Sequence, residues 1–261
     1  VINSVAVYDR NRQAAGSSLG AWENLIGPAQ MMAFFILMRV GFSFLRGNNR
    51  FAAGGSTDMY FNIIVFMSTG FCIAFLFRNV AIKSLSGLKL RAPLYYSRIK
   101  PLDILLALSL NDMRALATLS LAILGIVYYF TWSFQLDSPG LAISVYLLTV
   151  MMALGFGLSV VFLAKLNKWV IKLIRRLIQR VIIFTSGIFF ATFEIPAHMR
   201  PFITWNPILH GVELFRYSIN NEYPIPDISL SYLMLCSILM LSFSLILYRT
   251  NESLLLESND D

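Results

Sequence analysis

The stretch "FEIPAHMRPFITWNPILHGVELFR", residues Phe193 to Arg216, decides how this chain is interpreted. It lies between two long apolar runs, and it carries both histidines of the sequence. A straight helix cannot pass through Pro196, Pro201 and Pro207, because proline removes a backbone donor and clashes with the preceding turn. The stretch therefore predicts a broken, polar connection between two membrane-type segments.

The second half of this stretch predicts a short helix over Pro207 to Ile219. Asn caps free backbone N–H groups and proline suits the first helical position, so Asn206 followed by Pro207 is a helix-start signal. His210, Glu213 and Arg216 recur every three residues and predict a polar edge, which favours a helix at an interface. The residues alone leave two alternatives open: short helices that dip back into the membrane around a cavity, or a loop lying on the bilayer surface.

The composition places the chain among integral membrane proteins. Hydrophobic residues make up 57% and charged residues only 13%, with a mean hydropathy of +0.67, which is too apolar for a water-soluble core. The net charge of +7 comes from basic residues beside apolar runs and not from one continuous tract. This pattern favours membrane lipid over nucleic acid as the partner.

Six apolar runs are long enough to cross a bilayer, which needs roughly 20 residues per helix. They are Asn24 to Leu45, Met59 to Phe77, Ile104 to Phe134, Leu141 to Ala164, Leu177 to Phe193 and Leu230 to Tyr248. The expected fold is an all-α integral membrane protein with one domain over residues 1–261. Its parts are an N-terminal interfacial segment (1–23), spans one to five (24–193), a connection (194–227), span six (228–248) and a tail (249–261).

The distribution of Lys and Arg predicts the orientation. They gather between spans two and three and between spans four and five, which places these segments and both termini in the cytoplasm. In residues 165–180 they recur at helical spacing beside apolar residues, which indicates an interfacial anchor, a platform for an anionic lipid-linked substrate, or both. Cys72 and Cys236 lie inside apolar segments and are interpreted as packing residues.

Several residues within the spans are candidates for a transport path. Arg39 interrupts span one, and an ionisable residue at membrane depth is a functional hypothesis by default. A structural pairing with Asp58 is the alternative. Aromatic rings suited to sugars gather in two stretches, where membrane-interface belts and packing need the same residue types. These aromatic residues are Tyr128, Tyr129, Trp132, Phe189, Phe190 and Phe193.

The sequence speaks against an enzyme. His198, His210, Glu194 and Glu213 lack the spacing of a metal clamp or an acid–base pair. No Gly-x-x-x-x-Gly-Lys-Ser/Thr loop is present to hold nucleotide phosphates, so we expect no cofactor in this chain. A membrane-embedded transferase acting on lipid carriers is the less favoured alternative, because it would need an acidic metal-binding loop on the basic cytoplasmic face.

Four blocks of sequence resemble a known family. "SGIFF" at Ser186 to Phe190, with Pro196, and "WNPILHGVELFR" at Trp205 to Arg216 are similar to the ABC-2 type polysaccharide export permeases, which include capsule and O-antigen exporters. "LGAWENLIGP" at Leu19 to Pro28 and "IKPLDILLA" at Ile99 to Ala107 look like the starts of the first and third spans in that family.

The resemblance implies a homodimer in the bacterial inner membrane, driven by two copies of a separate ATP-binding subunit that holds ATP and Mg. The cargo would be a lipid-linked polysaccharide, with export proteins of the periplasm and outer membrane as further partners. Another cargo, such as a teichoic acid, a drug or a lipid, is the alternative within the same fold. The resemblance also implies that replacing Glu213 or Arg216 impairs export without loss of the folded dimer.

The resemblance assigns residues to two further roles. It favours two re-entrant helices on the outer side between spans five and six, which act as a gate built from Pro196, Trp205, Asn206, Pro207, His210, Glu213 and Arg216. It implies contact with the ATPase near a cytoplasmic helix that includes Ile82, Lys83, Ser84, Leu85 and Leu88.

Gly187 and Ala191 are spaced for close helix contact, which would place span five at the dimer seam.

Overall fold

The computed structural model describes the chain in part. The described residues are 29–30, 33–34, 37, 63–87, 102–103, 106–107, 110, 113–114, 117–118, 121–122, 125, 136–166, 173–174 and 184–250. Every regular element within these ranges is helical: α3 (Ile63–Gly87), α6 (Pro139–Leu166), the 3-10 helix η3 (Thr192–Glu194), α8 (Pro201–Thr204), α9 (Pro207–Ile219) and α10 (Leu230–Thr250). The all-α class is therefore confirmed for the described part.

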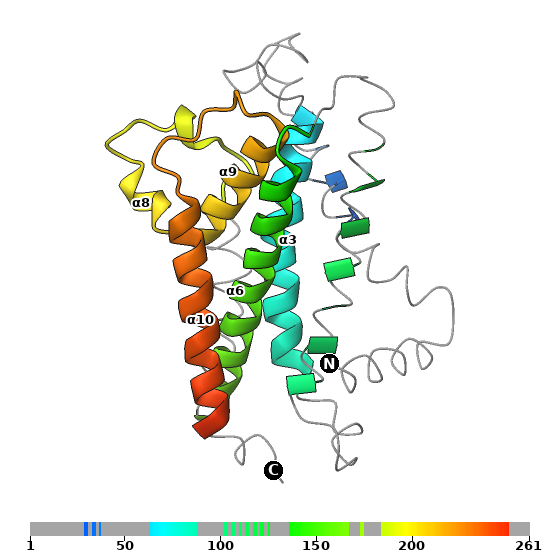
Figure 1. The fold of residues 1–261 in the computed structure, drawn as a ribbon, viewed down its shortest axis with the longest axis vertical. Coiled ribbons are helices and arrows are strands. Elements are labelled where there is room, and N and C mark those ends of the chain that lie inside the picture. Colours follow the sequence, from blue (N-terminus) through cyan, green and yellow to red (C-terminus); the bar gives the residue numbers. More distant parts are fainter. Residues whose placement is uncertain are drawn as a thin grey trace.

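Three of these helices, α3, α6 and α10, are long and apolar enough to cross a membrane, counting only the described residues. They correspond to the predicted spans two, four and six. α6 and α10 begin and end within two residues of the predicted limits. Figure 1 shows the three helices side by side, with α8 and α9 at one end of the bundle, which we call the α9 end.

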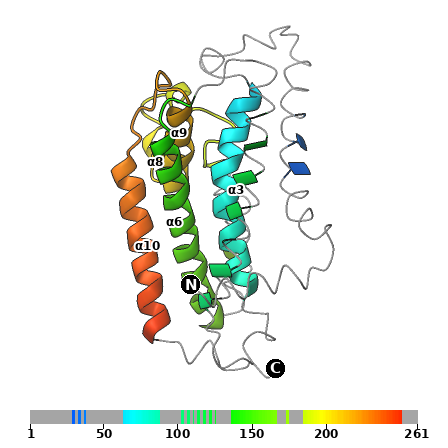
Figure 2. The same cartoon turned by 45° about the vertical axis from the view of Figure 1, so that its right-hand side comes forward.

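The three long helices run in the same direction. The Ser237 hydroxyl of α10 donates to the Leu148 carbonyl of α6 (3.0 Å), and Tyr248, eleven residues later, packs beside Leu158. Phe77 of α3 lies against Phe156 of α6, with ring centroids 5.7 Å apart. All three helices thus begin at the α9 end (Figures 1 and 2), as expected for the second, fourth and sixth of six alternating spans.

α3 carries most of the core. Its residues from Val65 to Phe77 are almost all buried, and they pack with apolar residues of α6 and α9. α10, in contrast, keeps much of its apolar surface exposed, including Leu235, Leu239 and Ile246. An exposed apolar face on a helix of this length is what a bilayer would cover.

Two predicted boundaries are wrong. Span two was expected to end at Phe77, but α3 continues to Gly87, because the charged residues that end the apolar run do not end a helix. The backbone at Ile82, Lys83, Ser84 and Leu85 therefore belongs to the last turns of α3 and not to a separate helix, while Leu88 lies outside the described residues.

Span five was expected to stay helical to Phe193, but the backbone is irregular from Thr185 to Ala191. Gly187 has a φ of +78°, which a right-handed helix does not allow. The proposed pairing of Gly187 and Ala191 on one helix face is accordingly wrong. These residues instead shape a turn that packs against α9.

Candidate functional site

The first turn of α9 is built as its sequence predicts. The Asn206 side chain accepts a hydrogen bond from the Ile208 backbone N–H (3.0 Å), and Pro207 occupies the first turn. The amide of Asn206 also donates to the Thr185 hydroxyl (2.8 Å). This one side chain therefore caps α9 and ties its start to the irregular segment that precedes η3.

The polar edge of α9 does not lie at a solvent or headgroup interface, which corrects the expectation from the sequence. His210 is 4% exposed, and Glu213 and Arg216 are both 0% exposed. The helix packs against α3, α6 and α10 at once, so its polar face and its apolar face are both enclosed. Charged groups this deep require partners, because an unpaired buried charge is costly.

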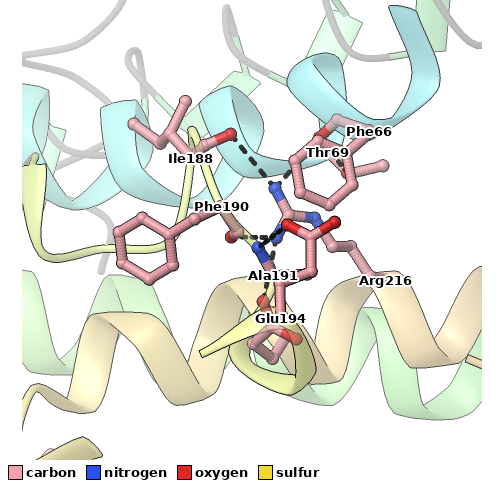
Figure 3. Close-up of polar contacts among 8 residues, drawn as sticks. Phe66, Thr69, Ile188, Phe190, Ala191, Glu194 and Arg216 are labelled. Atoms are coloured by element: carbon pink, nitrogen blue, oxygen red, sulfur yellow. Dashed lines mark hydrogen bonds and ion pairs between the residues drawn. The ribbon is translucent and has the colours of Figure 1, made fainter. Parts of the chain in front are cut away.

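Arg216 finds its partners on three segments. Its guanidinium donates to the Glu213 carboxylate (2.9 Å), to the Phe66 carbonyl of α3 (3.1 Å) and to the Ile188 carbonyl (3.3 Å). A longer contact of 3.4 Å reaches the Phe190 carbonyl, and the guanidinium carbon lies 3.5 Å from the centroid of the Phe66 ring. Figure 3 shows this side chain between α3 and the turn that holds Ile188 and Phe190.

Glu213 has further neighbours in this cluster. Besides Arg216, the Tyr223 hydroxyl and the backbone of Thr192 lie near its carboxylate. Tyr223 in turn packs edge-on against Phe193, with ring centroids 5.4 Å apart. The ion pair thereby joins α9, α3 and the turn at 185–191, and Tyr223 of the connection to α10 lies beside it.

Two glycines make room for this cluster. A Cβ at Gly70 of α3 would lie 2.9 Å from the Arg216 Nη2 and 3.0 Å from the Ile188 Cα. A Cβ at Gly187 would lie 2.5 Å from a methyl group of Leu209 and 3.6 Å from the Glu213 carboxylate. The close approach of α3, the turn and α9 therefore depends on small residues at both positions.

Replacing Gly187 with alanine is expected to lower the stability of the protein by about 1–3 kcal/mol, because a positive φ disfavours a side chain and Leu209 must also shift. The thermal unfolding midpoint in detergent measures this loss. Gly125→Ala is the control, since a Cβ there meets nothing within 4 Å. Equal midpoints for the two variants would show that the turn tolerates a side chain.

His210 uses both ring nitrogens. Nε2 lies 2.7 Å from the Thr204 carbonyl at the end of α8, and Nδ1 accepts the backbone N–H of Ser229 (3.0 Å), one residue before α10. Its ring packs against Tyr232, with centroids 4.6 Å apart. Neither His210 nor Glu213 is free to act on a substrate or metal. Among the described residues, no three His, Cys, Asp or Glu side chains could hold a metal ion together.

The remaining predicted gate residues lie away from this cluster. Pro196 is exposed in the loop before α8, and Trp205 is 58% exposed. Met199 and Phe202, just before and within α8, are exposed as well. The Tyr232 hydroxyl donates to the Trp205 carbonyl (2.7 Å), which joins the α8 region to α10.

The predicted substrate-path residues are described only in part. Phe189 and Phe190 are half-buried in the turn before η3, and Phe193 contacts Tyr223. Arg39, Tyr128, Tyr129 and Trp132 lie outside the described residues. Sequence reasoning missed Phe66, Gly70, Thr192 and Tyr223, which complete the ion-pair cluster. A glycine within the apolar run of α3 was the one signal that could have pointed there.

The chain matches the family model described as ABC-2 type transporter over residues 10–220. It is 26% identical to the polysialic acid transport protein KpsM of Escherichia coli over 195 residues, which cover 74% of this chain and 75% of that protein. It is 23% identical to the capsule polysaccharide export inner-membrane protein BexB of Haemophilus influenzae over 95% of this chain and 90% of that protein. It is 24% identical to the capsule polysaccharide export inner-membrane protein CtrC of Neisseria meningitidis serogroup B over 70% of this chain and 69% of that protein. With most of its length matched, this chain belongs to the ABC-2 type transporter family.

Proposed function

We propose that this chain is the membrane subunit of an exporter that moves a lipid-linked polysaccharide across the bacterial inner membrane. The similarity to three proteins named for polysaccharide transport or capsule polysaccharide export supports this cargo. The chain would act as a homodimer, with two copies of a separate subunit that binds ATP and Mg. It would supply the path for the cargo and no catalytic residue.

In this proposal, residues 194–227 form an outer gate, and the α9 end of the bundle faces outward. The observation that best supports this proposal is the buried Glu213–Arg216 pair. The Arg216 guanidinium donates to backbone carbonyls of α3 and of the turn before η3. Irregular backbone at membrane depth persists only where protein or a water-filled cavity surrounds it. The ion pair supplies such surroundings, so α8 and α9 are suited to dip back from the outer face.

The same cluster suggests how the gate is coupled to the spans. α9 contacts α3, α6 and α10 together, so a displacement of one of these helices changes the surface against which α9 packs. ATP-driven closure of the partner subunits would act on the inner end of α3, near Ile82 to Leu85. The movement would reach Phe66 and Arg216 along the helix, and α9 would then uncover the path lined by Arg39 and the aromatic residues.

Purification of the protein from native membranes in mild detergent tests this assignment. We expect a stoichiometric partner that carries a Walker-type nucleotide loop, and ATPase activity that rises with the lipid-linked polysaccharide. A teichoic acid or a drug that stimulates the activity more strongly would change the cargo and keep the transporter. A protein that is reproducibly recovered alone, without ATPase activity, would contradict the proposal.

A further inference from the structure

His210 has a protonation state that its neighbours define. The Thr204 carbonyl can only accept a hydrogen bond, so Nε2, 2.7 Å away, must carry the proton. The Ser229 backbone N–H can only donate, so Nδ1, 3.0 Å away, must be bare. The bonded form is thus the neutral imidazole with its proton on Nε2. Protonation of Nδ1 would place two hydrogens face to face.

The two bonds of His210 join three helices. Thr204 is the last residue of α8, and Ser229 immediately precedes α10. His210 itself lies in the first turn of α9 and is 4% exposed. A second link between the same helices runs from the Tyr232 hydroxyl to the Trp205 carbonyl (2.7 Å). Of the groups that make these two links, the imidazole is the one whose charge changes within the ordinary range of pH.

The charged groups around His210 are already paired with each other. On α9, Glu213 is bound to Arg216, and on the flanking loops Arg200 lies 3.6 Å from Asp227. The titratable groups that α10 presents nearby are Tyr232 and, one turn on, Cys236. Ile73 of α3 and Thr149 of α6 lie within 3.3 Å of a Cβ built on the neighbouring Gly211, and neither carries a charge. No unpaired carboxylate is therefore at hand to stabilise an imidazolium among these groups.

We propose that His210 is a pH-sensitive positioning residue, which holds α9 to the start of α10 in its neutral form and releases Ser229 when it is protonated. The consequence for export, that acid on the outer face slows it, rests on the proposed gate. The structural change itself does not depend on that function. The structural change and its consequence for export both follow from the loss of one hydrogen bond, the bond that Nδ1 accepts from the Ser229 N–H.

The pH range follows from the direction of the shift. Burial lowers the pKa of His210 from its ordinary value of 6.5, because the charged form loses solvation. A group whose pKa is lowered on folding stabilises the folded form above its ordinary pKa and loses that effect as the pH falls. The link between α9 and α10 is therefore intact at neutral pH and is lost as the pH falls through the lowered pKa of His210.

Amide hydrogen exchange of the protein in lipid nanodiscs tests the proposal without any transport assay. The Ser229 amide is bound by His210, and the Ile208 amide is bound at the same distance of 3.0 Å by Asn206, which does not titrate. Corrected for intrinsic rates, protection of Ser229 should fall about fivefold between pH 7.5 and pH 5, the effect of losing one hydrogen bond. Protection of Ile208 should stay constant. Constant protection of both amides would overturn the proposal.

The variant His210→Gln separates titration from packing. Glutamine also offers a donor group and an acceptor group, but it does not titrate. We expect its Ser229 protection to be independent of pH and its export, measured in cells at pH 7.5 and pH 5.5, to lose the acid sensitivity of the wild type. Equal acid sensitivity of both proteins would exclude His210 as its source. Absence of wild-type export at both pH values would count against the proposed function, while the amide measurement would still decide the role of His210.

Discussion

Replacing Arg216 with methionine is expected to destabilise the protein by about 3–5 kcal/mol, the usual effect of removing one partner from a fully buried ion pair. Glu213 would lose its bond of 2.9 Å, and the carbonyls of Phe66 and Ile188 would each lose a donor. The thermal unfolding midpoint in detergent and the fraction of monodisperse protein measure the loss. A midpoint equal to that of the wild type would show that the pair does not hold the α9 end together.

Two further variants separate charge from geometry in this cluster. Arg216→Lys keeps the positive charge but cannot present the planar fork that reaches several acceptors at once, so it should recover only part of the stability. The double variant Glu213→Gln/Arg216→Met removes both charges and should be more stable than Arg216→Met alone. If the pair also serves in gating, the double variant will fold and still fail to export.

The complete burial of Glu213 and Arg216 changes an expectation drawn from sequence. The resemblance implied that single replacements impair export while the folded dimer persists. Because both side chains are 0% exposed and bound to each other, single replacements should affect folding as well. The double variant is thus the informative one for export.

The elements that sequence predicted best are those specified by local chemistry. α9 begins at Pro207 and ends at Ile219 as expected, because the Asn206 cap and the proline act within one turn. α10 was equally predictable, since a long apolar run requires a helix that satisfies its own backbone. In both cases the deciding interactions lie within the element.

What could not be predicted depends on contacts between distant segments. The partners of Arg216 include backbone carbonyls at Phe66 and Ile188, and a carbonyl has no signature in sequence because every residue carries one. The spacing of His210, Glu213 and Arg216 correctly placed them on one edge, but whether that edge faces lipid headgroups or the core depends on where α3 lies. The irregular turn around Gly187 was hidden for a similar reason, since its apolar neighbours resemble those of a spanning helix.

α6 and α10 cross at a point where their backbones nearly touch. A Cβ placed on Gly155 would lie 2.6 Å from the Leu241 nitrogen and 2.7 Å from the Met240 carbonyl oxygen. Close crossings of this kind in membranes depend on small residues. The hydroxyl of Ser159 turns back to the Gly155 carbonyl (2.8 Å), and Ser237 bonds across to Leu148, so small side chains recur along both helices.

Replacing Gly155 with alanine is therefore expected to destabilise the protein by about 3 kcal/mol, the upper part of the range for overpacking. The atoms in conflict belong to the backbone of α10, which cannot change rotamer as a side chain can, so the whole helix must move away and the bond between Ser237 and Leu148 must lengthen. Gly140→Ala is the matched control, because it makes the same substitution on the same helix where a Cβ meets nothing within 4 Å. We expect the control to unfold at or above the wild-type midpoint, since alanine favours a helix over glycine, and Gly155→Ala to unfold well below it. Coinciding midpoints would mean that α6 and α10 are not held at this distance in the folded protein.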